Sequence, residues 1–161
     1  MNTVSVRHAA AIYVVKSDGR KETFNPETVK RDLWIACGAT CSAKDVEAIV
    51  NEILKELDGR EYITTAEIVD RVERILLMRA LSDPRFFEVA KKFELLNIYR
   101  DVYGEKWNSE WDPVDLRLSF DAVKVLASRY LLRDPDTRKF KETPRMMFER
   151  IAKSIAEVEY L

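Results

Sequence analysis

The fold-determining stretch is residues 14–25, which read Val-Val-Lys-Ser-Asp-Gly-Arg-Lys-Glu-Thr-Phe-Asn and run directly into Pro26. Asp18-Gly19 separates two short runs that contain β-branched and aromatic residues. Such a pair predicts a two-residue hairpin turn in which both residues adopt positive φ. Asn25 is a favourable N-cap, and Pro26 suits the first position of a helix. We therefore predict a β-hairpin that leads straight into a helix.

The same stretch gathers groups that can bind a nucleotide. Lys16 and Arg20 supply positive charge for phosphates, and the helix that begins after Asn25 offers free backbone N–H groups and a favourable dipole. The Glu22 carboxylate can accept hydrogen bonds from a base or a ribose. Hairpins before capped helices are also common without any ligand, and a lysine beside a turn is usually solvated, so a solvated surface is the alternative interpretation of this stretch.

Composition limits the function classes. A chain of 161 residues allows one domain, or one small domain with an appendage. The formal net charge of −1 shows no excess of Lys and Arg, which disfavours nucleic acid as a partner. No apolar run approaches the roughly 20 residues that span a bilayer, and no signal-peptide core is present. We expect a cytoplasmic protein with neither nucleic-acid nor membrane partners.

Catalytic and metal-binding residues are not expected either. Cys37 and Cys41 lie four positions apart, which is not a metal-pair spacing, and we interpret them as buried thiols. His8 is the only histidine, so Ser–His triads and multi-histidine metal sites are excluded. The carboxylates follow exposed helix faces rather than forming an acid–base pair.

Apolar periodicity and capping residues predict four helices after the hairpin. They run from Asn25 to Gly38, from the cap Ser42 to Asp58-Gly59, from the capping box of Thr64 and Glu67 through Leu76, and from Asp83-Pro84 toward Tyr103-Gly104.

The pattern changes at residues 106–113, which contain Trp107 and Trp111 without periodicity. We interpret this segment as a linker whose tryptophans pack on a neighbouring surface, with base stacking as the alternative. A helical pattern resumes at Leu118, breaks at residues 133–135, and restarts after the cap Thr143. These last helices lack a partner layer and would form a poor core by themselves, which indicates that they begin a larger folded unit.

The predicted fold is mainly α with a small N-terminal β-hairpin, an α+β class in which a four-helix domain precedes a short helical segment. We predict a flexible tail at residues 1–9, a domain at 10–104, a linker at 105–117 and the helical segment at 118–161.

A hairpin plus four helices, with Val14-Val15-Lys16, Asp18-Gly19-Arg20, Glu22 and Asn25, resembles the ATP-cone. This domain is the allosteric nucleotide-binding module at the N-terminus of many ribonucleotide reductases, and the resemblance covers about residues 10–104. ATP-cones also occur in anaerobic reductases and in a bacterial repressor of reductase genes, whose zinc ribbon does not precede the hairpin here.

The second half resembles the segment that leads into the reductase catalytic barrel. The resemblance rests on Leu118-Ser119, on residues 125–134, and on Glu142-Thr143-Pro144 with the residues that follow. The sequence of this segment is most similar to that of adenosylcobalamin-dependent reductases. It implies that a catalytic part outside this chain holds the radical cysteines and, in that class, adenosylcobalamin, so this chain alone cannot reduce ribonucleotides.

The resemblance implies that ATP or dATP binds under the hairpin and reports the nucleotide balance to a distant active site. Core packing is the alternative role for Val14, Val29 and Ile68. The expected nucleotide-binding residues are Val14, Val15, Lys16, Ser17, Gly19, Arg20, Glu22, Asn25, Val29, Thr65, Ile68 and Arg100.

Three positions depart from the family pattern. Ser17 and Thr28 stand where basic residues are common, and Val69 stands where some cones carry a histidine. Each lost charge-assisted hydrogen bond weakens triphosphate binding by roughly 1.5–3 kcal/mol, although Arg20, Lys21 and Arg100 offer replacements.

Our first hypothesis is an allosteric ATP/dATP-binding region of a ribonucleoside-diphosphate or triphosphate reductase. Its partners would be the remainder of the reductase chain and a second copy in a homo-oligomer. The second hypothesis is a degenerate cone that serves as a protein-docking domain without nucleotide. A DNA-binding regulator is disfavoured by the charge balance, and a standalone enzyme comes last.

Overall fold

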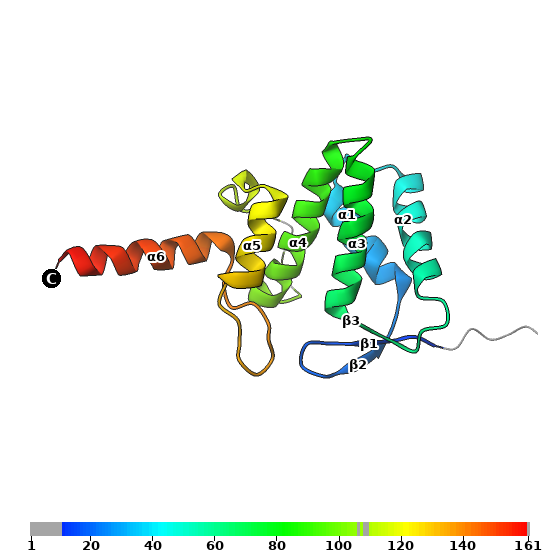
Figure 1. Ribbon diagram of the computed structural model, residues 1–161, viewed down its shortest axis with the longest axis horizontal. Helices are drawn as coiled ribbons and strands as arrows, with labels where there is room; N and C mark the ends of the chain where they lie inside the picture. The colour runs from blue at the N-terminus through cyan, green and yellow to red at the C-terminus, as the bar shows by residue number, and fades with distance from the viewer. Residues whose placement is uncertain (1–10, 106, 108–109, 161) are drawn as a thin grey trace, which may run out of the picture.

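The protein is described here by a computed structural model, which covers residues 11–105, 107 and 110–160. The predicted tail at residues 1–9, which includes His8, lies outside the described residues, as do linker residues 106, 108 and 109. The described chain is mostly helical with a small sheet near its N-terminus, which confirms the predicted α+β class (Figure 1).

Three short strands form the sheet in the order β2-β1-β3. β1 (Tyr13–Val15) and β2 (Lys21–Thr23) make the predicted antiparallel hairpin. β3 (Tyr62–Thr64), which the sequence analysis does not predict, runs parallel to β1 and places Ile63 opposite Val14. Both of these side chains are buried, so one face of the sheet closes the end of the helical core.

The hairpin turn corrects the prediction of a two-residue loop. Lys16 and Arg20 close a three-residue loop, in which the Gly19 N–H donates to the Lys16 carbonyl. Gly19 has φ 85°, whereas Asp18 is not among the described residues with positive φ. This is the type I turn with a glycine bulge. A two-residue loop would place Lys16 directly opposite Lys21, where like charges repel.

Four helices follow the predicted order. They are α1 (Pro26–Cys37), α2 (Ala43–Glu56), α3 (Thr65–Ala80) and α4 (Arg85–Tyr103). Figure 1 shows α1, α2 and α3 on one side of the molecule, with the sheet across their lower end.

The predicted caps of α1, α2 and α3 are confirmed, whereas α4 begins at Arg85 after Pro84 and has no side-chain cap. The Asn25 side chain accepts a hydrogen bond from the Glu27 N–H and begins α1. Ser42 with Asp45, and Thr64 with Glu67, form reciprocal capping boxes at the starts of α2 and α3. Each cap satisfies backbone donors that have no partner inside the helix.

The cysteines form a Cys37–Cys41 disulfide, so the interpretation of both as thiols is wrong. Gly38, with φ 54°, ends α1 and turns the chain so that Cys41 returns to the end of that helix. Both cysteines are buried, as predicted.

The C-terminal part contains a short 3₁₀ helix, η1 (Asp115–Arg117), followed by α5 (Phe120–Arg129) and α6 (Pro144–Glu159). α5 ends at Arg129, a few residues before the predicted break at residues 133–135. In the turn that follows, an isolated bridge joins Arg133 to Phe140. α6 extends away from the other helices (Figure 1).

α4 contributes to two hydrophobic clusters. Its first half, including Phe86 and Phe93, packs with the sheet and α1 to α3. Its second half, including Ile98 and Tyr99, packs with α5, with Phe140 and with the start of α6. α4 therefore joins the predicted nucleotide-binding part to the C-terminal part.

Candidate functional site

The inner face of the sheet carries Lys16 and Glu22, two of the predicted nucleotide-binding residues. Glu22 lies directly opposite Val14, and Lys16 follows Val14 by two positions, so all three share the face turned toward the helices. Lys16 Nζ lies 3.4 Å from Glu22 Oε2, and both side chains are partly exposed. A partly exposed ion pair contributes little stability. A ligand can therefore take the place of Glu22 beside Lys16, or of Lys16 beside Glu22, at small cost.

Lys21 lies on the opposite face and cannot replace a missing phosphate contact there. It pairs with Val15, and its Nζ lies 5.0 Å from the centre of the Tyr62 ring. Because alternate residues of a strand point to opposite faces, Lys16 and Lys21 form a natural pair of test and control positions.

The hairpin turn holds its own arginine. Arg20 Nε donates to Asp18 Oδ2 across 2.7 Å, and the Arg20 N–H donates to Asp18 Oδ1. These hydrogen bonds keep the pKa of Asp18 below its ordinary value. Ser17 and Gly19 are exposed in the same turn. A phosphate would therefore have to compete with Asp18 for Arg20.

Two helix N-termini adjoin opposite ends of β1. Phe24, just before α1, donates its N–H to the Ile12 carbonyl, whereas Thr64, just before α3, pairs with Val15. α3 therefore begins beside the end of β1 that leads to Lys16. The free N–H groups of a helix start are suited to anionic groups.

Thr65 is the most informative residue at this helix start. Its Oγ1 is buried and has no hydrogen-bond partner. Buried hydroxyls are normally paired, so an orphaned one is typical of a site that receives a ligand or water. Ile68, one turn further along α3, is half-buried against the core. The sequence-predicted pair Thr65 and Ile68 thus lies beside the inner face of the hairpin.

Asn25 and Val29 serve the fold in this structure. The Asn25 oxygen accepts the α1 cap hydrogen bond, and Val29 is buried in the first cluster together with Val14. Packing is therefore the role that the structure shows for both valines, while the Asn25 amide nitrogen remains a further donor.

Arg100 is held by α1 rather than by the hairpin. Its Nη1 lies 2.7 Å from Asp32 Oδ2, while Asp32 Oδ1 is buried without a hydrogen-bond partner. Burial raises the pKa of Asp32, against the effect of Arg100. Sequence reasoning misses Asp32, because its partner lies on a distant helix and no local motif marks it.

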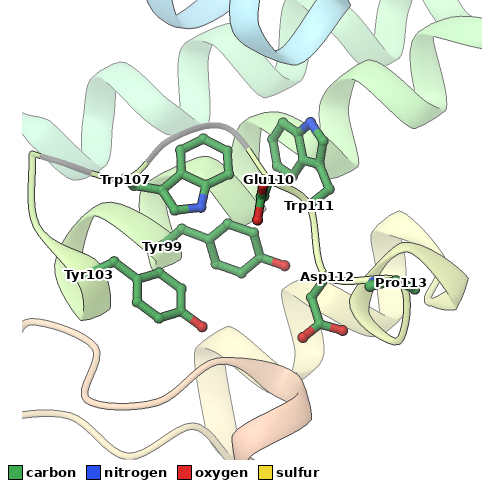
Figure 2. Close-up of a pocket in the computed structure, with 7 residues that line it drawn as sticks. All are labelled: Tyr99, Tyr103, Trp107, Glu110, Trp111, Asp112 and Pro113. Atoms are coloured by element: carbon green, nitrogen blue, oxygen red, sulfur yellow. The ribbon is translucent and has the colours of Figure 1, made fainter.

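A separate cavity of about 480 Å³ lies at the start of the predicted linker (Figure 2). Trp107 and Trp111 pack around Tyr99 with ring centres 5.3 and 5.8 Å away, which supports the packing interpretation of the two tryptophans. None of the predicted nucleotide-binding residues lines it. The cavity is lined by Tyr99, Tyr103, Trp107, Glu110, Trp111, Asp112 and Pro113.

Within the described residues, no cluster of three or more histidine, cysteine or acidic side chains is arranged to hold a metal ion. No helix in that part of the chain is long and apolar enough to cross a membrane.

Two family models match the chain. Residues 12–102 match the ATP cone domain. Residues 116–160 match the all-alpha domain of ribonucleotide reductase. The two matches lie in sequence, one on each side of residues 103–115.

Similar proteins include a reductase and two repressors. The chain is 35% identical over 150 residues to a vitamin B12-dependent ribonucleoside-diphosphate reductase of Thermoplasma acidophilum, and the match covers 92% of this chain but 19% of that protein. It is 34% identical over 87 residues to the transcriptional repressor NrdR of Synechococcus, covering 52% of this chain and 44% of the repressor. Against NrdR of Gloeobacter violaceus it is 31% identical over 112 residues, covering 65% and 64%. The chain thus spans less than two thirds of each relative.

Proposed function

Because the chain belongs to the ATP-cone family and continues into the all-alpha domain of ribonucleotide reductase, we propose that it is the N-terminal regulatory region of such a reductase. In this proposal it binds ATP or dATP and is not catalytic by itself. The proposal rests on the two family matches that follow one another in this chain. The reductase relative matches across both of them, over 92% of the chain.

The nucleotide is proposed to bind between the hairpin and the start of α3. Lys16 contacts the phosphates, since its ammonium is held by a partly exposed 3.4 Å pair with Glu22 that a ligand can displace. Glu22 and the orphaned Thr65 hydroxyl contact the base or the ribose. Arg20 and Arg100 join after release from their carboxylates.

The remainder of a reductase is the proposed partner of α6. Phe148, Ile151, Ile155 and Val158 recur at spacings of three and four residues, and all are exposed. Such a stripe is the seam along which one helix packs on another. A second copy of the chain is the other proposed occupant, and light scattering of wild type and Ile155→Glu distinguishes the two. A dimer lost in the variant would favour self-association.

Adenosylcobalamin does not fit the residues described here. The cavity beside Tyr99 is lined by aromatic, acidic and proline side chains, without a histidine that could bind cobalt, and we assign the cofactor no ligands in this chain. Any such cofactor belongs to the catalytic part of the reductase. A cytoplasmic location follows from the proposed reductase role.

The test is calorimetric titration of the chain with ATP and with dATP, supported by thermal unfolding. Ligand at 100 times its Kd adds about 2.7 kcal/mol to the free energy of unfolding, so a clear rise in Tm is expected. Lys16→Ala should weaken binding. Lys21→Ala is the matched control, because it removes the same charge from the outer face of the same hairpin.

Equal loss of affinity in both variants would contradict the phosphate role of Lys16 and indicate a general charge effect. Absence of heat and of any Tm rise with either nucleotide would overturn the proposal. The protein-docking hypothesis would then gain support, in agreement with the internal pairing of Arg20 and Arg100.

A further inference from the structure

A buried ionic cluster joins α3, α4 and α5. Lys124 Nζ lies 2.8 Å from Glu73 Oε2 and 3.6 Å from Glu94 Oε2. It also lies 3.5 Å from Asp70 Oδ1 at the exposed rim. Glu73 and Glu94 are only 3% and 4% exposed. One ammonium from the reductase-like part therefore contacts two buried carboxyl groups from two helices of the cone.

The cluster is incompletely satisfied. Glu73 Oε1 and Glu94 Oε2 are both buried without a hydrogen-bond partner. Two buried carboxyl groups share one cation, so small changes in the spacing of the helices alter their interaction strongly in a medium of low dielectric constant. An apolar contact of the same area would respond far less to such a displacement.

α3 connects this cluster to the candidate nucleotide site. Thr65 begins the helix, and Glu73 lies eight residues further along it, about 12 Å at the rise of an α-helix. A ligand that pairs with the Thr65 hydroxyl acts directly on the helix that presents Glu73 to Lys124. A continuous helix transmits a shift or rotation over two turns without loss of register.

The far side of the cluster leads to α6. Lys124 lies on α5, and the chain just beyond α5 is tied to the next helix by Glu142. The Leu132 N–H donates to Glu142 Oε1, and Arg150 of α6 donates to both Glu142 oxygens at 2.8 and 3.0 Å. A displacement of α5 therefore reaches the helix whose apolar stripe is exposed.

We propose that the contact of Lys124 with Glu73 and Glu94 couples nucleotide binding at the hairpin to the position of α5, and through it to α6. This inference rests on the proposed function, because it requires a nucleotide at the hairpin. Lys124 acts as a positioning residue that touches no ligand.

The experiment is hydrogen exchange of the 161-residue chain with and without saturating ATP, with ATP affinity measured in parallel by calorimetry. In wild type, ATP is expected to change amide exchange in α5 by about fivefold or more. Lys124→Met keeps the apolar stem and should bind ATP while losing this response. Lys124→Arg should restore it, and Lys153→Met, which removes an exposed charge on α6, should leave it intact.

The outcomes separate the two proposals. No ATP binding by wild type rejects the proposed function itself. ATP binding without a response in α5 overturns the coupling alone, and so does a response that persists in Lys124→Met. If Lys124→Met does not fold, Glu94→Gln provides the same comparison, because it removes the charge of the Glu94 oxygen that lies 3.6 Å from Lys124 Nζ while keeping the side-chain shape.

Discussion

The Tyr99 hydroxyl donates a 2.6 Å hydrogen bond to Asp115 Oδ2 inside the protein. The other Asp115 oxygen accepts the N–H of Arg145 in the first turn of α6. Burial raises the pKa of both Tyr99 and Asp115, so the tyrosine stays neutral as a donor. Through these two hydrogen bonds, Asp115 connects α4 to the start of α6.

Tyr99→Phe should therefore destabilise the fold. It removes the donor and leaves Asp115 short of a partner, which typically costs about 1–3 kcal/mol. Urea unfolding followed by tryptophan fluorescence measures the change. Tyr103→Phe is the control, because that exposed tyrosine should change stability by no more than about 0.5 kcal/mol. Equal effects of the two variants would contradict the role of this hydrogen bond.

Stability should fall as the pH rises across the neutral range. Burial, together with the neighbouring Glu94 carboxylate, raises the pKa of Glu73 from 4.5 to about 9 against the effect of Lys124. A raised pKa in the folded state means that the folded protein binds the extra proton. Its contribution is therefore complete below about pH 4.5 and is lost as the pH approaches 9.

Comparison of wild type with Glu73→Gln isolates this effect. The other titrating groups are common to both proteins, so the difference between their free energies of unfolding reports Glu73. Wild type should lose stability relative to the variant from pH 5 to about pH 9. A constant difference over this range would show that Glu73 titrates normally.

The Cys37–Cys41 disulfide should make stability depend on reductant. Closing a loop of five residues restricts the unfolded chain by about 2 kcal/mol, so reduction should lower the free energy of unfolding by that amount. Thiol titration of the denatured protein should detect no thiols before reduction and two afterwards. Cys37→Ser/Cys41→Ser should be insensitive to reductant, and reactive thiols in the untreated denatured protein would contradict the bond.

Local features of the sequence predict the helices well. The capping boxes at Ser42 and Thr64 each act within four residues, so both the donor and the acceptor are visible in one motif. The turn type is harder to predict. Asp18-Gly19 favours a two-residue loop in isolation, but the observed register avoids a direct Lys16–Lys21 pair, and the Asp18 carboxylate binds Arg20 instead.

Long-range pairings escape the sequence analysis for a common physical reason. β3 is a strand because it pairs with β1, which lies far away in the sequence. Its own residues indicate a helix start instead, because Thr64 is the cap of α3. Likewise, Lys124 and Glu73 look like ordinary charges on exposed helix faces until the packing of α5 on α4 brings Lys124 beside the buried Glu73. In the candidate site, the sequence offers candidate residues by type, but it does not predict the pairing of Arg100 with Asp32.

Thr65→Val offers a direct test of the candidate nucleotide site. The Thr65 hydroxyl is buried without a partner, so its removal should leave stability unchanged or slightly higher. If the hydroxyl binds the nucleotide, ATP affinity should fall by about 1 kcal/mol, or roughly fivefold. Thr64→Val is the control with the opposite pattern, because it removes the α3 cap and should cost about 1 kcal/mol of stability. Calorimetry and urea unfolding of both variants give the two quantities, and unchanged ATP affinity in Thr65→Val would place the nucleotide elsewhere.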